Sequence, residues 1–412
     1  MSISKKFSTD FLIIGAGIIG VTIALEIKKR CPNKKIIIIE KECQAGFHSS
    51  GRNSGVLHAG FYYTADSLKA RFCREGNRMM KIYCKENNCL VNNNGKLVIT
   101  KNESELTNLK MLYDRGINNG VHLTWLSEKE AREIEPRVRT IERAIFSPDT
   151  ASVDPVEVMQ SVVKKAQASG IEFLYNEKYL KSNSKKKIVI TNQRKIISGY
   201  VINAAGLYAD KIAKQFGLGM HYEIVPFKGL YLYSNEKVGA LKTHIYPVPD
   251  LNYPFLGVHF TVTAAGKIKI GPTAIPAFWR EQYHGFNRFS LSELMHILKR
   301  ESILFFKNKF HFRQVAIHEL KKYRKSFLAQ QAAYMLDNFS AVDYQAWGKP
   351  GIRAQLIDKR RNTLVNDFCY ESDDYSFHVL NAVSPAFTCS FPLAEFLVDK
   401  IFSSGNLKAK NF

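Results

Sequence analysis

The sequence has no C-x-x-C pair, no apolar run of membrane-spanning length, no internal repeat and no low-complexity linker. Its seven cysteines are scattered, and the spacing of the closest two, Cys84 and Cys89, suits neither a zinc site nor a redox pair. We therefore expect reduced thiols, no metal site and a cytoplasmic location. Any contact with the inner face of a membrane would be peripheral. The chain also lacks the basic–aromatic modules of nucleic-acid-binding proteins, which argues against nucleic acid as a partner.

Acidic residues are scarce relative to basic ones, with 37 Asp and Glu against 59 Lys and Arg, which gives a net charge of +22. This excess suits an anionic cofactor, an anionic substrate or an acidic lipid surface, and the basic stretch Lys307–Lys325 is the candidate for the lipid contact. The alternative is a solvated, lysine-rich surface. A chain of 412 residues is long enough for two domains, which could be interleaved.

The segment Asp10–Glu40 reads as a strand, a glycine turn, a helix and a second strand. Phe11–Ile14 and Ile36–Ile39 are short apolar runs, typical of parallel strands buried on both faces. The helix is expected from about Ile18 to Lys29. This order predicts a parallel α/β sheet, and it explains the apolar stretch near the N-terminus better than a signal peptide does.

Gly15, Gly17 and Gly20 have the spacing G-x-G-x-x-G inside that segment. The first glycine permits a tight turn, the second lets a pyrophosphate approach, and the third lets the helix pack on the strand. The N–H groups and dipole of the helix start favour phosphate. Glu40 ends the second strand, where a carboxylate can accept the hydroxyls of an adenosine ribose. The pattern predicts a dinucleotide site without separating FAD from NAD.

Other segments carry local signals. The polar loop 41–54 follows the second strand, at the edge where ligands bind in such sheets. Residues 199–217 read as another strand, turn and helix, with small residues at the turn. Asn92–Thr100 is predicted to be a hairpin with NNNG as its turn, Ser127 and Glu130 to form a capping box, and residues 222–275 to form a curved antiparallel sheet.

Several segments closely resemble the L-2-hydroxyglutarate oxidase/dehydrogenase family, within the D-amino-acid-oxidase-like flavoproteins. They include SSGRNSGVLHAGFYYTADSLKARFCREGN, WLSEKEAREIEP, GYVINAAGLYADKIAKQFG, VPFKGLYLY and HVLNAVSPAFTCSFPLAEFLVDKI. The resemblance implies FAD as cofactor and an α/β (α+β overall) fold, with a Rossmann-like FAD-binding domain and an interleaved antiparallel β-sheet substrate domain. The FAD-binding domain is expected at 1–90, 150–220 and 345–412, and the substrate domain at 91–149 and 221–344.

The fingerprint and the resemblance together predict the residues that bind the cofactor. The segment after Asn381 is expected to bring helix N–H groups to the flavin, with Ser384 as helix cap. The predicted cofactor-binding residues are Gly15, Gly17, Ile18, Ile19, Gly20, Glu40, Lys41, Ser49, Ser50, Asn53, Ser54, Gly55, Ala205, Gly206, Ser384 and Ala386.

Oxidation of a 2-hydroxy acid needs a base for the hydroxyl proton and cations for the carboxylates. His58 and His259 are the candidate bases, because histidine titrates near neutral pH; the alternative is that each is structural. Arg353 is the leading carboxylate ligand, with Lys228 and Arg52 behind it, since arginine binds a carboxylate bidentately. The alternative for these cations is a surface ion pair. Three tyrosines could donate hydrogen bonds or simply pack: Tyr62, Tyr231 and Tyr246.

These expectations describe an FAD-dependent oxidoreductase that converts L-2-hydroxyglutarate, a small dicarboxylate, to 2-oxoglutarate and passes electrons to quinone or oxygen. The chain departs from the family pattern at Lys228, Leu230, Thr273 and Trp279. A related flavoenzyme acting on another hydroxy acid, an amino acid or glycerol 3-phosphate therefore stays open. So does a flavin-binding electron carrier without turnover.

Overall fold

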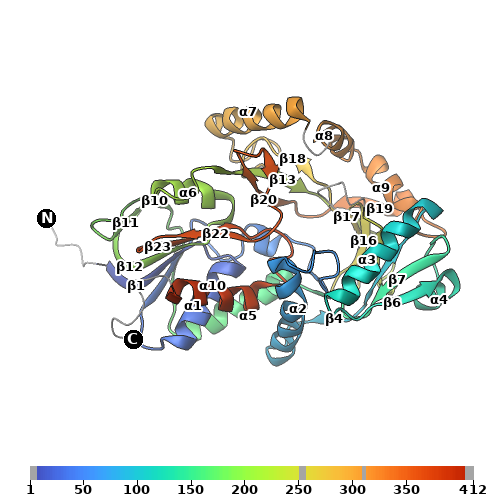
Figure 1. Ribbon diagram of the computed structural model, residues 1–412, viewed down its shortest axis with the longest axis horizontal. Coiled ribbons are helices and arrows are strands. Elements are labelled where there is room, and N and C mark those ends of the chain that lie inside the picture. Colours follow the sequence, from blue (N-terminus) through green and yellow to red (C-terminus); the bar gives the residue numbers. More distant parts are fainter. Residues whose placement is uncertain (1–6, 250–256, 309–311, 404–412) are drawn as a thin grey trace. The chain divides into compact units, whose positions relative to one another are not determined.

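The computed structural model describes residues 7–249, 257–308 and 312–403, and within them the chain folds into two compact units. Unit 1 comprises residues 1–51, 156–224 and 354–412, and unit 2 comprises residues 52–155 and 225–353. The mixed α/β class predicted from the sequence is confirmed (Figure 1). Residues 52–90, which we grouped with the cofactor domain, cluster with unit 2, and the functional labels of the domains stay a prediction.

Unit 1 is built on an eight-stranded sheet with the order β10-β11-β12-β1-β2-β9, extended by β23 beside β12 and by β22 beside β23. Strands β12, β1, β2 and β9 are parallel, as is the β12–β23 pair, whereas β10, β11 and β22 pair antiparallel. The strands are β1 Phe7–Ile14, β2 Ile36–Ile39, β9 Glu172–Leu174, β10 Tyr179–Asn183, β11 Ile188–Thr191, β12 Lys195–Asn203, β22 Cys369–Ser372 and β23 Ser376–Asn381.

Helices bury both faces of the centre of this sheet (Figure 1). Leu12 and Ile14 pack with Ile212 of α6, whereas Phe11 makes an edge contact with Phe402 of α10. Helix α10 packs along α1. The helices of unit 1 are α1 Ile18–Arg30, α5 Pro155–Ala168, α6 Ala209–Gln215 and α10 Ser390–Ser403, with short 3-10 turns η1 Ser49–Gly51 and η3 Gly206–Tyr208. Burial on both faces explains why β1 and β2 are apolar without alternation.

Unit 2 contains a second eight-stranded sheet, ordered β19-β14-β17-β16-β15-β5-β7-β6, and a small sheet ordered β3-β8-β4. Every pairing in the larger sheet is antiparallel except β15 with β5. Its strands are β5 Lys96–Ile99, β6 Thr124–Ser127, β7 Arg143–Ser147, β14 Leu232–Ser234, β15 His244–Pro247, β16 His259–Val262, β17 Ile268–Gly271 and β19 Tyr344–Trp347; the smaller sheet has β3 Val56–Leu57, β4 Val91–Asn92 and β8 Ala151–Val153.

The predicted hairpin at Asn92–Thr100 is wrong. β4 pairs with β8 in the small sheet, whereas β5 pairs with β7 and β15 in the large one. All four residues of β5 are buried, so both of its edges need partners, and a two-residue strand cannot supply them. The connection between them is held by side chains instead: Asn92 donates to the Thr263 carbonyl, and Asn94 contacts His244.

Helices cover parts of unit 2. The capping box predicted at the start of α4 is confirmed, since Ser127 and Glu130 exchange side-chain and backbone hydrogen bonds. The segment that follows Ser290 is also largely helical. The helices are α2 Leu68–Glu86, α3 Leu106–Asn118, α4 Glu128–Ile134, α7 Leu291–Lys307, α8 Phe312–Lys321 and α9 Lys325–Ala333, with 3-10 turns η2 Glu103–Glu105 and η5 Ala341–Asp343.

A four-stranded sheet, ordered β18-β13-β20-β21, contains the two strands in which the chain passes between units. Its strands are β13 Tyr222–Gly229, β18 Ile275–Pro276, β20 Gly351–Asp358 and β21 Thr363–Leu364. Across residues 7–249, 257–308 and 312–403, none of the helices is both long enough and apolar enough to cross a membrane.

Candidate active site

The three fingerprint glycines shape the turn between β1 and α1. Gly15 has φ +105°, and a Cβ placed on it would lie 2.7 Å from the Ala204 carbonyl oxygen. A Cβ on Gly20 would lie 2.1 Å from the Gly15 carbonyl oxygen, so neither position accepts a side chain without moving backbone. A Cβ on Gly17 would meet, among the described residues, only the Ser50 hydroxyl at 3.1 Å. Gly17 therefore borders open space at the start of α1.

The backbone around this turn is held by two side chains of unit 1. Ser50 Oγ accepts the Ile18 N–H at 2.9 Å, and Glu40 Oε2 accepts the Ala16 N–H at 2.9 Å. Glu40 Oε1 accepts the Glu42 N–H at 3.0 Å. Glu40 is thus a structural link between β2 and the turn, a role that the sequence did not reveal. Each carboxylate oxygen has a second lone pair, so the predicted ribose contact of Glu40 stays a prediction.

A second turn of small residues follows β12 in unit 1. Ala205 precedes the 3-10 turn η3, and its N–H donates to Asn203 Oδ1 at 3.2 Å. Gly206 has φ +51°, and a Cβ on it would meet none of the described atoms within 4 Å. The turn therefore leaves open space beside the exposed Gly206.

The predicted helix cap at Ser384 is wrong, because α10 begins at Ser390. The intervening residues form turns, in which the Ala386 N–H donates to Val383 and the Cys389 N–H donates to Pro385. These turns separate Ser384 from the first helical residue, so its side chain cannot cap α10. Ser384 is exposed and Ala386 is buried, so their cofactor contacts stay a prediction.

The other predicted cofactor residues lie in both units. In unit 1, Ile18 and Ile19 are buried in the first turn of α1, Ser49 begins η1, and Lys41 Nζ lies 2.6 Å from Glu42. In unit 2, Asn53, Ser54 and Gly55 make a tight turn: Asn53 Oδ1 accepts the Gly55 N–H, Ser54 Oγ accepts the Val56 N–H, and Gly55 has φ +78°.

The groups of unit 1 fit the adenosine diphosphate part of FAD. Gly17 can accommodate a pyrophosphate at the helix start, because this N-cap residue has no side chain, although Ser50 Oγ already accepts the Ile18 N–H. Glu40 ends β2 beside the same turn. The chemistry of this donor set is the one that dinucleotide-binding turns use.

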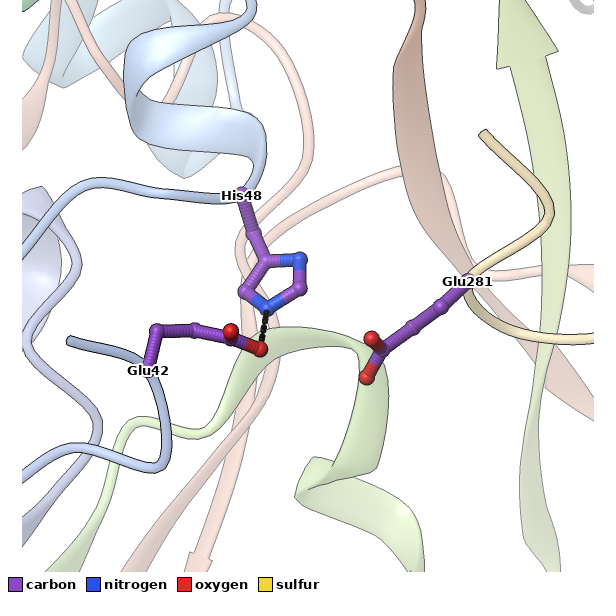
Figure 2. A group of neighbouring side chains, drawn as sticks. All are labelled: Glu42, His48 and Glu281. Atoms are coloured by element: carbon purple, nitrogen blue, oxygen red, sulfur yellow. Dashed lines mark hydrogen bonds and ion pairs between the residues drawn. The ribbon is translucent and has the colours of Figure 1, made fainter. Parts of the chain in front are cut away.

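A polar group also follows β2 in unit 1. His48 Nε2 lies 3.0 Å from Glu42 Oε1, the contact that is dashed in Figure 2. The same carboxylate oxygen also contacts Lys41 Nζ. Glu42 is thus held between two basic side chains. Glu281, also drawn in Figure 2, belongs to unit 2, where it pairs with Arg288.

In unit 2, one face of the large sheet is polar although it is buried. Strand register pairs Lys96 with His244 and Thr261 with Lys269. His259 lies on the same face, stacked on the Tyr246 ring with centroids 3.6 Å apart. The opposite face is an apolar core that includes Leu97, Ile99, Ile245, Phe260, Val262, Ile268 and Ile270. Because side chains alternate along each strand, one face of the sheet is hydrophobic and the other face carries ionisable and hydroxyl side chains.

His259 is held in its neutral form. Its Nδ1 lies 2.8 Å from the Gly257 carbonyl oxygen, which can only accept, so Nδ1 carries the proton and Nε2 is the acceptor. Burial lowers the pKa of His259 to about 3, and the positive charges of Lys96, Arg353 and Lys269 act in the same direction. The Gly257 hydrogen bond opposes the shift.

His58 follows β3 and is also buried. Burial lowers its pKa well below the usual value, and Lys96 and His259 add to this shift. Its carbonyl oxygen accepts from Cys73 Sγ and Asn77 Nδ2 of α2, which fixes the backbone there. The structure thus brings the two predicted bases, His58 and His259, into one electrostatic group.

Arg353 is the predicted cation that joins this group. It is half-buried on β20, and Nη1 donates to the Thr273 carbonyl at 3.4 Å. Its charge lowers the pKa of His259 and opposes the burial that raises the pKa of Tyr231. Arg52 lies beside the start of the same strand, since a Cβ on Gly351 would lie 2.4 Å from the Arg52 carbonyl oxygen. The Arg52 guanidinium lies 4.4 Å from the Tyr283 ring centre.

Lys228 has a different environment. Its Nζ lies 3.4 Å from Tyr323 Oη, and burial lowers its pKa to about 8. The charges that act on His58 and His259 come from other residues, so the structure does not group Lys228 with the two histidines.

Two buried lysines of the polar face were missed by the sequence analysis. Lys96 begins β5, and Lys269 lies in β17, where its Nζ donates to the Ser54 carbonyl at 3.0 Å. The sequence signal that could have identified them is a lysine inside or beside a β-branched run: Lys96 in KLVIT and Lys269 in IKIG. Such a lysine is costly in a strand with two buried faces and therefore points to a function.

Known proteins resemble this chain over nearly its whole length. A family model described as FAD dependent oxidoreductase matches residues 10–400. The L-2-hydroxyglutarate dehydrogenase of Escherichia coli strain K12 is 34% identical over 95% of this chain and 93% of its own length. The mitochondrial L-2-hydroxyglutarate dehydrogenases of Dictyostelium discoideum and Homo sapiens are 35% and 34% identical over 98% and 96% of this chain, and 94% and 89% of theirs.

Solved structures agree in fold. L-α-glycerophosphate oxidase from Mycoplasma pneumoniae, with FAD bound, superposes with a TM-score of 0.75 at 21% identity, over 95% of this chain and 94% of that one. Glycine oxidase from Geobacillus kaustophilus gives 0.73 at 18% identity, over 97% and 96%. FAD is the cofactor, and the chemistry is FAD-dependent oxidation of a hydroxy acid. The chain belongs to the L-2-hydroxyglutarate dehydrogenase family of FAD-dependent oxidoreductases.

Proposed function

We propose that this enzyme oxidises L-2-hydroxyglutarate to 2-oxoglutarate and passes the electrons to a quinone or to oxygen. The similarity to L-2-hydroxyglutarate dehydrogenases over about 95% of the chain carries this proposal. The net charge of +22 and the buried cations of unit 2 suit a substrate with two carboxylates.

The proton chemistry is assigned to the histidines of unit 2. FAD, when bound, accepts the hydride from the hydroxyl-bearing carbon. His259 Nε2 accepts the hydroxyl proton, because its Nδ1 is committed to the Gly257 carbonyl. His58 is the alternative base, since its lowered pKa also keeps it neutral at physiological pH.

Substrate orientation is assigned to the arginines. Arg353 binds the C1 carboxylate through two parallel N–H bonds, because its charge already acts on His259. Arg52 is the second candidate ligand, because its backbone lies beside the start of β20, the strand that carries Arg353. Lys228, beside Tyr323, is the third, and it would serve the distal carboxylate.

Anaerobic flavin reduction tests the proposed substrate. The purified yellow holoenzyme is mixed without oxygen with L-2-hydroxyglutarate, and the visible absorption of oxidised flavin is followed. We expect rapid bleaching, and slow or no bleaching with the D enantiomer, which serves as the matched control. Bleaching by an amino acid or glycerol 3-phosphate, but not by L-2-hydroxyglutarate, would move the enzyme to a related substrate. No bleaching by any of them would favour a flavin-binding electron carrier.

A surface on α7 and α8 supports the membrane contact that we also propose (Figure 1). Large apolar side chains are exposed there beside exposed basic ones, an arrangement typical of proteins that lie on anionic lipid. The apolar residues are Leu291, Met295, Phe306, Ile317 and Leu320, and the basic residues are Lys299, Lys307, Arg313 and Lys321, with Arg324 shortly after the end of α8. Lys322, which we had included in the basic stretch, is buried and pairs with Glu319, so it does not contribute.

Vesicle sedimentation at low and high salt tests this contact. We expect binding to anionic vesicles that weakens as salt rises, little binding to neutral phosphatidylcholine, and loss of binding in the double variant Arg313→Glu/Lys321→Glu. Lys185→Glu/Lys186→Glu makes the same charge change on exposed lysines of unit 1 and should bind like the wild type. Equal binding of both variants would refute the proposed surface.

A further inference from the structure

The Asn203 side chain, at the end of β12 in unit 1, holds the turn that follows it. Asn203 Oδ1 accepts the Ala205 N–H at 3.2 Å, and Nδ2 donates to the Ala209 carbonyl oxygen at 2.8 Å. A backbone N–H only donates and a carbonyl only accepts, so these two bonds determine which amide atom is oxygen and which is nitrogen. One fully buried side chain thus links the residue before η3 to the first residue of α6.

This turn lies directly against the glycine turn between β1 and α1. The Ala204 N–H donates to the Ile14 carbonyl oxygen at 3.0 Å. A Cβ on Gly15 would lie 2.7 Å from the Ala204 carbonyl oxygen and 3.2 Å from Ala205 Cα. Because backbone meets backbone here, a displacement of the turn after β12 would also displace the dinucleotide turn.

His378 of β23 is the third partner of the Asn203 amide. The two residues are register partners in the parallel pair β12–β23, and Asn203 Nδ2 donates to His378 Nδ1 at 2.9 Å. On the other side of the ring, His378 Nε2 lies 2.9 Å from Ser376 Oγ. Ser376 Oγ in turn donates to Asp373 Oδ1 at 2.9 Å. Asn203, His378 and Ser376 are each 0% exposed, so a buried row of hydrogen bonds runs from Asp373 to the turn.

The direction of these hydrogen bonds is determined from both ends of the row. At one end, Asn203 Nδ2 donates, so His378 Nδ1 accepts and the ring proton is on Nε2. At the other end, Asp373 Oδ1 accepts the N–H groups of Tyr375 and Ser376. The Ser376 hydroxyl also donates to this oxygen, so Ser376 Oγ accepts the Nε2–H of His378. Both ends therefore require the same neutral tautomer of His378.

This tautomer opposes reversal of the Asn203 amide. A reversed amide would place donor against donor at Ala205, and acceptor against acceptor at Ala209 and at His378 Nδ1. Burial lowers the pKa of His378 to about 4, which favours the neutral ring, and the charge of Asp373 opposes this shift. Glu371, the register partner of His378 on β22, accepts the Gly219 N–H at 2.6 Å.

We propose that His378 is a positioning residue for the cofactor: through the Asn203 amide, it holds the turn at 204–209 in the shape that the adjoining dinucleotide turn needs to bind FAD. Ser376 and Asp373 fix the tautomer that makes this possible. The proposal concerns retention of the cofactor, which is measured without substrate. It therefore does not depend on the proposed oxidation of L-2-hydroxyglutarate.

Release of FAD from the holoenzyme tests the effect on the cofactor. Each purified protein is diluted, and free FAD is measured in the ultrafiltrate. His378→Leu removes both ring nitrogens and should raise the dissociation constant of FAD about tenfold. His378→Asn returns an acceptor oxygen near the position of Nδ1 and should bind FAD nearly as the wild type does. Unchanged affinity in His378→Leu, or equal losses in the two variants, would overturn the proposal.

Tyr200→Phe is the matched control. Tyr200 is buried on the same strand as Asn203, and its hydroxyl donates to the Asp373 carbonyl oxygen at 3.3 Å. Strand alternation places its side chain on the opposite face of the sheet from Asn203. We expect wild-type affinity for FAD in this variant. A loss as large as that of His378→Leu would show that any lost hydrogen bond in this sheet weakens the cofactor site, and would refute a specific role of His378.

A double-mutant cycle shows whether His378 acts through Asn203. Asn203→Ala should weaken FAD binding at least as much as His378→Leu does. Adding His378→Leu to Asn203→Ala should then cause little further loss, because the amide that His378 orients is already absent. Two independent losses that multiply in the double variant would contradict the proposal.

The ring tautomer can be measured in the wild-type holoenzyme, even if a variant fails to fold. The protein is labelled with 15N-histidine, and the ring nitrogens are observed by NMR at neutral pH, with His378→Asn identifying the signals. We expect a protonated Nε2 and an unprotonated Nδ1 in His378. A proton on Nδ1 would mean that the ring cannot accept from Asn203, and the proposal would fail.

Discussion

Replacing Lys96 by methionine should stabilise unit 2 at acidic and neutral pH. Burial lowers the pKa of Lys96 from 10.5 to about 7. Each pKa unit corresponds to about 1.4 kcal/mol, so burying the protonated lysine costs about 5 kcal/mol below pH 7. Apolar replacements of buried charges have stabilised other proteins by about 1–4 kcal/mol, which makes this value an upper bound.

The sign of the pH dependence follows from proton binding. Below about pH 7 the folded and unfolded states both bind the Lys96 proton, and the folded state carries the full cost. Between about pH 7 and 10.5 the unfolded state binds more protons, so wild-type stability rises with pH. The advantage of Lys96→Met should therefore shrink by about 3 kcal/mol between about pH 6 and pH 9.5.

Tryptophan fluorescence during urea unfolding measures the difference in unfolding free energy between wild type and Lys96→Met within unit 2. All three tryptophans, Trp125, Trp279 and Trp347, belong to unit 2, as Lys96 does. FAD is kept in equal excess for both proteins, because bound cofactor itself stabilises the folded state. A stability gain that is the same at both pH values, or a loss of stability at about pH 6, would refute the reasoning.

Three further predictions concern the cofactor turn and the carboxylate ligand. Gly17→Val should fold but purify without yellow colour, because among the described residues a Cβ there would meet only the Ser50 hydroxyl, and the side chain would enter the space expected for the pyrophosphate; stoichiometric flavin would contradict this. Gly20→Ala should instead give insoluble or strongly destabilised protein, since its Cβ would lie 2.1 Å from the Gly15 carbonyl oxygen, and a normal melting temperature would count against it. Arg353→Lys keeps the charge but loses the bidentate fork, and should lower kcat/KM roughly a hundredfold, or about 2–3 kcal/mol, with Arg353→Met lower still and both variants yellow. Near-normal turnover in Arg353→Met would show that Lys228 or Arg52 binds the carboxylate instead. A colourless but folded variant would show that Arg353 binds the flavin rather than the substrate.

Local features of the fold could be predicted because neighbouring residues decide them. The turn from Gly15 to Gly20 and the capping box of Ser127 and Glu130 each depend on residues a few positions apart. The hairpin at Asn92–Thr100 failed because the partners of β5 come from residues 143–147 and 244–247, which local turn signals do not identify.

The candidate site was predictable by residue type but not by environment. His58, His259 and Arg353 were chosen because their side chains suit the chemistry, and the structure brings them into one electrostatic group. Lys96 could not be predicted as a site residue, because its burial depends on strand register in a sheet assembled from distant segments. The neutral state of His259 depends first on its burial, and the position of its proton on Nδ1 depends on the Gly257 carbonyl. Neither is visible in a linear pattern.

The interleaved chain has a consequence for synthesis. In unit 1, Phe11 of β1 packs against Phe402, and α1 packs along α10. Helix α1 therefore acquires this partner only after α10 has been synthesised. β12 likewise acquires β23 only after all of unit 2 has been made. At about 5–20 residues per second, the ribosome leaves the apolar face of β1 uncovered for tens of seconds. We therefore expect the nascent chain to bind chaperones during that interval, and a ribosome that stalls before α10 to leave a half-covered sheet that is prone to aggregation.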